Sequence, residues 1–191
     1  MKVLIMGSAG VESTRLITHA IENEIQFEVA HVVHNNISYV EMTQLEKMCL
    51  GKGVFAHPPN NKKIALYRVD VKKDWFDKNN QRQHRDTACW LPIAMMLAAR
   101  GAYDQVWFGC HRHDHLNEVQ DIFGVFNLMM RSIAKTTTLQ APLMMETKKR
   151  QYMNVMSHGM HEHLVWCQYD PLKPCGECGK CREFNKYVEA K

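Results

Sequence analysis

A short polar loop near the start of the chain has residue types suited to holding a phosphate. It reads MGSAGVEST, from Met6 to Thr14, and follows the apolar run Lys2–Met6 (KVLIM). Backbone N–H groups of such a loop at a helix start bind anions, because the helix dipole reinforces them. The loop has no lysine and is not the GxxxxGK[ST] phosphate loop. The predicted phosphate-binding residues are Gly7, Ser8, Ala9, Gly10, Val11, Glu12, Ser13 and Thr14.

Glu12 is the unusual member of this loop. A carboxylate beside a phosphate is repulsive unless a divalent cation lies between them, so Glu12 indicates Mg²⁺ at this position. The alternative is a structural carboxylate in the first helical turn, complementing the helix dipole, with Ser8 or Ser13 as the cap. The residue pattern leaves both interpretations open.

The second group of reactive residues lies at the other end of the chain. Four of the seven cysteines, Cys167, Cys175, Cys178 and Cys181, have the spacing C-x7-C-x2-C-x2-C. Four thiolates with C-x2-C steps suit a tetrahedral zinc ion that closes a structural site. An iron–sulfur cluster and a redox-active C-x-x-C pair are the alternatives. We interpret the site as a zinc staple without a catalytic role.

The loop at residues 6–14 and the four cysteines are placed by a predicted scaffold of strands that alternate with helices. Apolar runs predict five strands, and periodic apolar stripes predict the helices between them. This order predicts an α/β fold of three layers with a mainly parallel five-stranded sheet, whose ligands bind beyond the carboxyl ends of the strands. The expected strands are Lys2–Met6, Phe27–Val33, Ile64–Val71, Gln105–Gly109 and Thr137–Ala141, and the expected helices are Glu12–Asn23, Ile37–Leu50, Thr87–Arg100, Asn117–Ala134 and Thr147–Ser157.

Composition narrows the class of protein. The chain has 191 residues, of which 46% are hydrophobic and 23% charged, so we expect one domain with a small appendage. A formal net charge of +4 is too small for a dedicated nucleic-acid binder. No apolar run approaches the length of a membrane span. The apolar run Val3–Met6 is too short for the core of a signal peptide, so we expect none. We therefore expect a cytoplasmic protein.

The stretch SAGVEST resembles the SGGxDS pyrophosphate-binding loop of the PP-loop ATP pyrophosphatase superfamily. Together with the cysteine spacing, it resembles the 7-cyano-7-deazaguanine synthases, the QueC family. In the same register Arg85 and Asp86 fall on an Arg-Asn pair of that family, and Gly109 and Asp114 on its strand-end glycine and aspartate. The segment APLMMETKKR, which contains Lys148, resembles the family's PL…TK segment. The resemblance covers nearly the whole chain.

The sequence departs from that family at identifiable positions. Ala9 stands where the loop has a glycine, and it fits without strain if its φ is negative. Glu12 replaces an aspartate and reaches one methylene further. After Asp114, the stretch EVQDIFGVF retains only Asp121 and Phe126 of the family's substrate segment.

The resemblance implies a fold and a reaction. The fold is Rossmann-like, of the adenine nucleotide alpha hydrolase type, with residues 1–160 as the PP-loop domain and 161–191 as the zinc-binding tail. The reaction converts 7-carboxy-7-deazaguanine, ATP and free ammonia into 7-cyano-7-deazaguanine through an acyl adenylate and an amide. ATP with Mg²⁺ and one structural Zn²⁺ are the implied cofactors. The implied partners are these small molecules and a second copy in a homodimer, with no direct nucleic-acid or membrane contact.

The resemblance also assigns roles to residues outside the loop. Gly109 joins residues 7–14 in binding the nucleotide, and Asp114 joins Glu12 at the divalent ion. Arg85 and Lys148 supply positive charge near the anionic substrate or transition state. Taken by itself, Arg85 could equally belong to a polar loop, and Lys148 to a helix surface.

Other functions remain open at this point. A close variant of the reaction stops at 7-amido-7-deazaguanine for DNA modification. Another PP-loop adenylating enzyme would act on tRNA. A protein of a different class would be an inactive, zinc-stapled nucleotide binder, which the change at Glu12 and the altered substrate segment favour.

Overall fold

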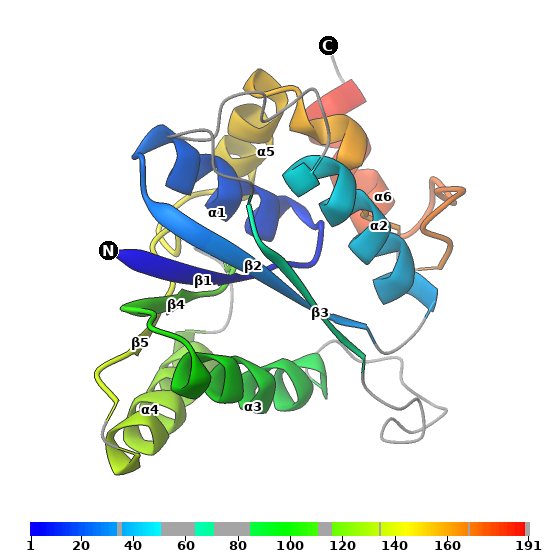
Figure 1. The fold of residues 1–191 in the computed structure, drawn as a ribbon. Coiled ribbons are helices and arrows are strands. Elements are labelled where there is room, and N and C mark those ends of the chain that lie inside the picture. The colour runs from blue at the N-terminus through cyan, green and yellow to red at the C-terminus, as the bar shows by residue number, and fades with distance from the viewer. Residues whose placement is uncertain are drawn as a thin grey trace.

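Five strands, all parallel, form one sheet in the order β3-β2-β1-β4-β5 (Figure 1). The computed structural model describes residues 1–33, 36–50, 64–70, 85–110, 116–133, 135–167 and 169–189. The strands are β1 Lys2–Met6, β2 Gln26–Val33, β3 Leu66–Asp70, β4 Gln105–Trp107 and β5 Thr138–Gln140. The central strand β1 is apolar because both of its faces are covered, and Val3, Leu4 and Ile5 are fully buried.

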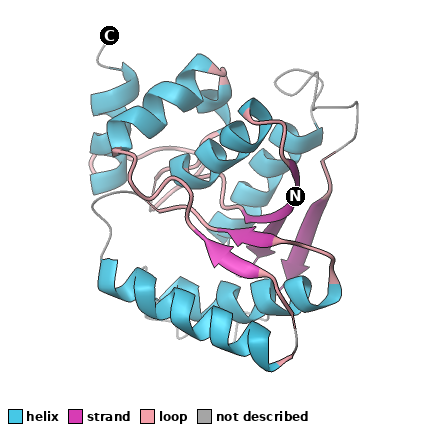
Figure 2. Cartoon of the chain, turned by 90° about the vertical axis from the view of Figure 1, so that its left-hand side faces the viewer, coloured by secondary structure: helices cyan, strands magenta, loops and turns pink. Residues whose placement is uncertain are grey.

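Helices cover both faces of the sheet, which confirms the predicted three-layer α/β fold (Figures 1 and 2). One face carries α1 Val11–Glu22, α2 Asn36–Leu50, α5 Lys148–Ser157 and α6 Gly179–Phe184. The other carries α3 Arg85–Arg100 and α4 Leu116–Ser132. Two apolar cores follow from this arrangement. Leu16, Ile17 and Val155 lie in the first core, and Ala98, Phe126 and Met130 in the second.

Some boundaries differ from the predicted ones. Helix α3 runs through Pro92 and begins at Arg85, two residues before the predicted start at Thr87. Strand β4 ends at Trp107, so Gly109 lies beyond the strand and not at its last position. The chain still follows the sheet at Phe108, whose N–H donates to the Gln140 carbonyl at 3.2 Å. Segments 51–63, between α2 and β3, and 71–84, between β3 and α3, lie outside the described residues.

The C-terminal tail packs against the first core. Leu164, Val165 and Phe184 are buried there. Two short helical turns that the sequence pattern did not predict lie on either side of this segment. These turns are the 3-10 helix η3 Met160–His163 and the π-helix η4 Asn185–Glu189. The division of the chain into a domain at residues 1–160 and a tail at residues 161–191 stays a prediction.

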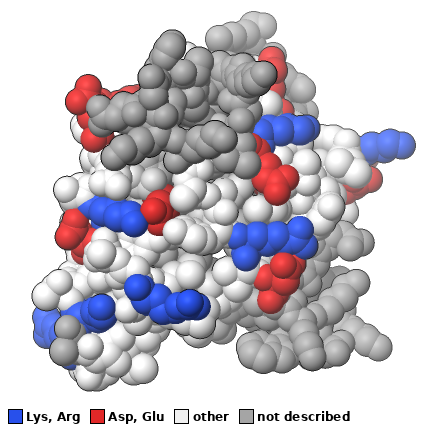
Figure 3. All heavy atoms as spheres, viewed as in Figure 1, with Lys and Arg blue, Asp and Glu red and all other residues white. Residues whose placement is uncertain are grey.

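None of the helices in the described part of the chain is both long and apolar enough to span a bilayer. On the face shown in Figure 3, basic and acidic side chains of the described residues are interspersed.

Candidate functional site

A pocket of about 300 Å³ lies beyond the carboxyl ends of β1, β2 and β4, which is where the parallel sheet predicted a ligand to bind. Four of the predicted loop residues line it. Its lining comprises Met6, Gly7, Ser8, Glu12, Ser13, His31, Val32, Glu41, Trp90, Phe108 and Gly109.

Backbone contacts hold the loop that forms one wall of this pocket. The N–H of Gly7 donates to the Ala30 carbonyl at 2.8 Å, and the N–H of Ser8 donates to the Ser13 Oγ at 3.1 Å. Helix α1 begins after its N-cap Gly10, where no side chain forms a capping hydrogen bond. The suggested cap by Ser8 or Ser13 is therefore wrong. The first turn of α1 directs its N–H groups toward this end of the sheet, as anion binding requires.

Ala9 adopts a left-handed backbone conformation, with φ at +51°. The condition for an unstrained alanine, a negative φ, is not met. An L-residue in this conformation costs about 1–2 kcal/mol relative to the right-handed region. The Ala9 carbonyl accepts a hydrogen bond of 2.9 Å from the Val165 N–H, so the start of the tail holds the strained loop in place.

Gly109 is required by the close approach of the chain after β4 to the start of α1. A Cβ at this position would lie 2.6 Å from the Glu12 Cβ and 3.0 Å from the Ser13 backbone nitrogen. These distances are shorter than any ordinary contact, so a side chain here would displace the loop. Gly109 therefore sets the position of the loop.

Glu12 and Lys148 form an ion pair, although 136 positions separate them in sequence. Lys148 is the first residue of α5 and is only 6% exposed, so it does not lie on a helix surface. Its Nζ also lies 3.7 Å from the Glu183 carboxylate. Burial lowers the pKa of Lys148 to about 7, with Lys180 acting in the same direction and Glu183 against it. When protonated, Lys148 compensates the charge of Glu12, and in that form of the site electrostatics alone does not demand Mg²⁺.

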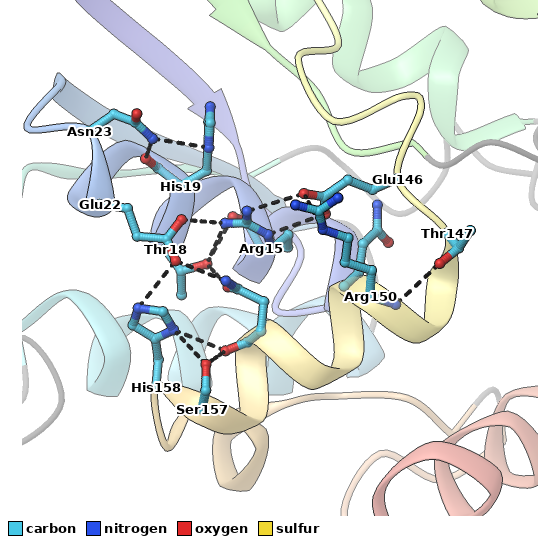
Figure 4. Close-up of polar contacts among 12 residues, drawn as sticks. Arg15, Thr18, His19, Glu22, Asn23, Glu146, Thr147, Arg150, Ser157 and His158 are labelled. Atoms are coloured by element: carbon cyan, nitrogen blue, oxygen red, sulfur yellow. Dashed lines mark hydrogen bonds and ion pairs between the residues drawn. The ribbon is translucent and has the colours of Figure 1, made fainter.

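A polar network joins α1 to α5 and to Glu146, which lies just before α5 (Figure 4). Arg15 donates to both carboxylate oxygens of Glu146 at 3.2 Å and to Glu22 at 3.0 Å. Asn154 donates to Glu22 at 2.8 Å and accepts from Thr18 at 2.8 Å. The two-point contact between Arg15 and Glu146 fixes the chain just before α5. Lys148, two residues further on, is thereby held against the start of α1.

Four pocket residues with polar or aromatic side chains were not singled out from the sequence. They are His31, Glu41, Trp90 and Phe108. The rings of Trp90 and Phe108 stack with centroids 5.5 Å apart at 29° and give the pocket an aromatic wall. His31 was detectable in principle, because a polar residue interrupts the apolar run VAHVV at the end of the strand. Trp90 and Phe108 carry no such signal, since aromatic residues in apolar runs are usually core.

Two further predicted residues, Arg85 and Asp114, lie partly or wholly outside the described part of the structure. Arg85 is the first residue of α3, and its side chain is outside the described part of the structure. Asp114 lies in segment 111–115, outside the described residues. Their predicted roles stay predictions.

The four predicted cysteines of the tail come together in one cluster. Their sulfur atoms all lie within 4.8 Å of one another, and Cys175 and Cys181 are 3.9 Å apart. A tetrahedral ion with bonds of about 2.3 Å to sulfur places its ligands at such separations. A four-iron cluster, in which each thiolate binds a different iron, holds the sulfurs further apart. The arrangement therefore fits a single metal ion.

Backbone N–H groups support the sulfur atoms. Cys167 accepts from the N–H groups of Asp170 and Cys175, both at 3.4 Å, and Cys178 accepts from Cys181 at 3.4 Å. Burial alone would raise the pKa of the Cys167 thiol, but these hydrogen bonds outweigh it and lower the pKa to about 6. They favour the thiolate of Cys167, which is the form that binds metals, whereas burial raises the pKa of Cys181 in the same cluster to about 12.

Comparison with known proteins identifies relatives by fold only. No family model matches the chain, and no curated protein matches its sequence. Among solved structures, the U34-tRNA thiolase NcsA from Methanococcus maripaludis, solved with its [4Fe-4S] cluster, is similar at a TM-score of 0.55 and 13% identity. The match covers 89% of this chain but only 61% of the thiolase chain.

A second solved structure is described as a predicted subunit of tRNA methyltransferase from Methanocaldococcus jannaschii. It matches with a TM-score of 0.49 and 11% identity over 82% of this chain and 76% of that chain. At 13% identity, the property shared with the thiolase is the fold.

Proposed function

We propose that this chain is an ATP-dependent adenylating enzyme that binds the departing pyrophosphate with the loop at residues 7–14. The observation that carries the proposal is the arrangement around the start of α1. An uncapped helix start, a loop fixed by Gly109 and the buried Lys148 all converge beside one pocket beyond the strands. Backbone N–H groups and a cation placed in advance stabilise negative charge on a leaving pyrophosphate.

The proposed substrate is 7-carboxy-7-deazaguanine, with free ammonia as the nitrogen donor. The support is the joint occurrence of the loop and the four-cysteine spacing in one chain, together with the stacked pair Trp90 and Phe108. A flat heteroaromatic ring packs favourably on such a wall. Arg85 and Asp114 keep their proposed roles near the carboxylate and the divalent ion.

The chemistry proceeds in two adenylation steps. A carboxylate oxygen of the substrate attacks the α-phosphorus of ATP, and pyrophosphate leaves toward the loop. Ammonia then attacks the acyl carbon and AMP departs. Loss of one proton from the attacking nitrogen gives the amide. In the second step the amide oxygen attacks the α-phosphorus of another ATP with loss of pyrophosphate. Departure of AMP and a proton from that adduct leaves the nitrile.

The protein groups act by position and charge. Lys148 lies at the loop that receives the negative charge, and its contact with Glu12 orients both side chains. Mg²⁺, when bound with ATP, would neutralise phosphate charge, and Glu12 and Asp114 are the carboxylates proposed to hold it. Cys167, Cys175, Cys178 and Cys181 would hold one structural Zn²⁺.

A second candidate function has an observation in its favour. The fold is shared with a U34-tRNA thiolase, so an adenylating enzyme that acts on a tRNA base is the alternative. The single-ion spacing of the cysteine sulfurs favours the deazaguanine reaction, because a zinc staple accompanies it.

Product analysis separates these functions. The purified chain is incubated with ATP, Mg²⁺, 7-carboxy-7-deazaguanine and isotopically labelled ammonium, and the products are identified by mass spectrometry. We expect the nitrile, with label in its nitrogen and AMP in twofold molar excess over it, as two adenylation steps require. Accumulation of the labelled amide would establish the shorter reaction. AMP formation only when tRNA is supplied would favour the tRNA enzyme and contradict the proposal.

A further inference from the structure

His31 is a buried histidine with two short contacts to backbone carbonyls. It lies on β2, lines the pocket and is only 3% exposed. Its Nδ1 is 2.7 Å from the carbonyl oxygen of Gly7, and its Nε2 is 2.7 Å from the carbonyl oxygen of Ser38. The ring thus bridges the first residue of the phosphate loop and the first turn of α2.

The two backbone oxygens that contact the ring nitrogens can only accept hydrogen bonds. A carbonyl oxygen cannot donate, and a neutral imidazole has only one N–H. In either neutral tautomer, one ring nitrogen would direct its lone pair at a carbonyl oxygen 2.7 Å away in a buried setting. Such an unmade buried bond costs about 1–3 kcal/mol. The imidazolium, with two N–H donors, satisfies both contacts.

The charged groups around His31 are consistent with a positive ring. Glu41 on α2 places a carboxylate oxygen 3.8 Å from Nε2. On β3 the register neighbour of His31 is Arg68, whose guanidinium pairs with Asp70 at 2.7 Å. From α1, Glu12 lines the same pocket and pairs with Lys148. From α3 and the end of β4, the lining residues Trp90 and Phe108 carry no charge.

We propose that His31 is held as an imidazolium and acts as a positioning residue for the phosphate loop. The Gly7 carbonyl and the Ser8 N–H belong to one planar peptide unit and point in opposite directions. His31 binds the carbonyl, and the Ser13 Oγ binds the N–H at 3.1 Å. The proton on Nδ1 therefore fixes the orientation of this peptide, and its removal favours a peptide flip that releases Ser13.

The consequence for ATP rests on the proposed function: the affinity for the nucleotide should depend on the Nδ1 proton of His31. In the imidazolium form, the loop is set for phosphate and a positive charge lines the pocket. Loss of the proton removes the charge and unlocks the peptide. ATP affinity should then fall as the pH rises through the titration of His31.

Nitrogen NMR of the histidine rings tests the charge assignment on the unaltered protein. At about pH 7, where free histidine is mostly neutral, we expect both ring nitrogens of His31 to carry protons. His19 provides a neutral reference in the same spectrum, because burial, aided by Arg15, lowers its pKa. A bare ring nitrogen on His31 would overturn the proposal without any recourse to ATP.

Calorimetric titration with ATP tests the positioning role. The variant His31→Gln retains one N–H donor group and cannot titrate, so we expect about tenfold weaker ATP binding and a flat pH profile. His19→Gln is the matched control and should keep the wild-type affinity and profile. Unchanged affinity and pH profile in a folded His31→Gln protein would contradict the role. If the wild-type protein binds no ATP while His31 carries both protons, the proposed function fails and the charge assignment stands.

Discussion

The phosphate loop at residues 7–14 and the cysteine cluster at residues 167–181 are built in opposite ways. All four metal-binding residues of the cluster come from one short segment, and its supporting N–H groups come from the same segment. The loop depends on distant residues, with Gly109 setting its position, Lys148 pairing with Glu12 and His31 holding its first carbonyl. A locally encoded site can be read from spacing, whereas the loop's partners are set by the fold.

The two regions are nevertheless in contact. The Val165 N–H, just before the cluster, donates to the carbonyl of the strained Ala9. Phe184, just after the cluster, packs in the same core as Leu16 of α1 and stacks on Trp166 with centroids 3.7 Å apart. Order in the tail therefore supports the loop. Five predictions test this comparison, from the largest expected effect to the smallest.

Removing one ligand should abolish the cluster. In Cys178→Ser, a buried thiolate is replaced by a poor metal ligand, so we expect loss of one metal ion per chain and a fall in unfolding free energy of about 4 kcal/mol or more. Elemental analysis and thermal unfolding measure the two effects. Cys49→Ala, at a buried cysteine outside the cluster, should keep the metal. Zinc should be the metal found, and iron in its place would contradict the zinc staple.

Removing the buried cation should disable the loop without affecting the cluster. Lys148→Met retains the length of the side chain but removes the cationic partner of Glu12 and one positive charge beside the proposed pyrophosphate site. We expect a fall of about 10²–10³-fold in pyrophosphate exchange, the scale of losing one stabilising group for a transition state. The exposed neighbour in Lys149→Met should behave as wild type. Full activity in Lys148→Met would show that Lys148 has no role in pyrophosphate exchange.

A methyl group at the end of β4 should displace the loop. Gly109→Ala forces a Cβ against Glu12, and the overpacking should cost about 1–3 kcal/mol in ATP binding. Gly124→Ala is the matched control, because a Cβ there meets nothing within 4 Å and a helix gains from alanine. Calorimetry with ATP compares the two. Equal affinity in both variants would show that the close approach at Gly109 is unimportant.

Relieving the strain at Ala9 should improve the loop. Ala9→Gly suits the positive φ and should raise the unfolding free energy by about 1 kcal/mol, less the entropy that glycine adds to the unfolded chain. Glu24→Gly, at the second non-glycine residue of positive φ, should stabilise in the same way but leave ATP affinity unchanged. A lower melting temperature for Ala9→Gly would show that the methyl group contributes more than the strain costs.

Acid should weaken the support between α1 and α5. Burial acts to raise the pKa of Glu22, but hydrogen bonds from Asn154 and Arg15 outweigh it and hold the pKa below 4.5. Because the folded state binds this proton less readily than the unfolded state, the stabilisation is present above pH 4.5 and is lost as pH falls through the lower folded value. Below pH 4.5, the free energy of unfolding should depend less on pH in Glu22→Gln than in the wild-type protein. An unchanged slope would contradict the network's role.

Features that leave a short-range pattern in the sequence could be predicted from it. Apolar runs predicted all five strands, and the C-x2-C steps predicted the cluster. Several features were not predictable because they depend on tertiary contact. They include the burial of Lys148 at the start of α5, which looked like a solvated charge cluster with Lys149 and Arg150. The left-handed Ala9 is a further example, since its carbonyl accepts a hydrogen bond from the distant Val165.

Exchange of labelled pyrophosphate into ATP tests the central claim most directly. The claim is that the loop binds the pyrophosphate released when a carboxylate is adenylated. With Mg²⁺ and 7-carboxy-7-deazaguanine present, we predict exchange in the wild-type chain and its loss when the acid is omitted. Glu12→Asp should retain exchange, and Glu12→Ala should lose most of it. ATP binding without any exchange, whether the acid or a tRNA is supplied, would contradict the claim and identify the chain as an inactive nucleotide binder.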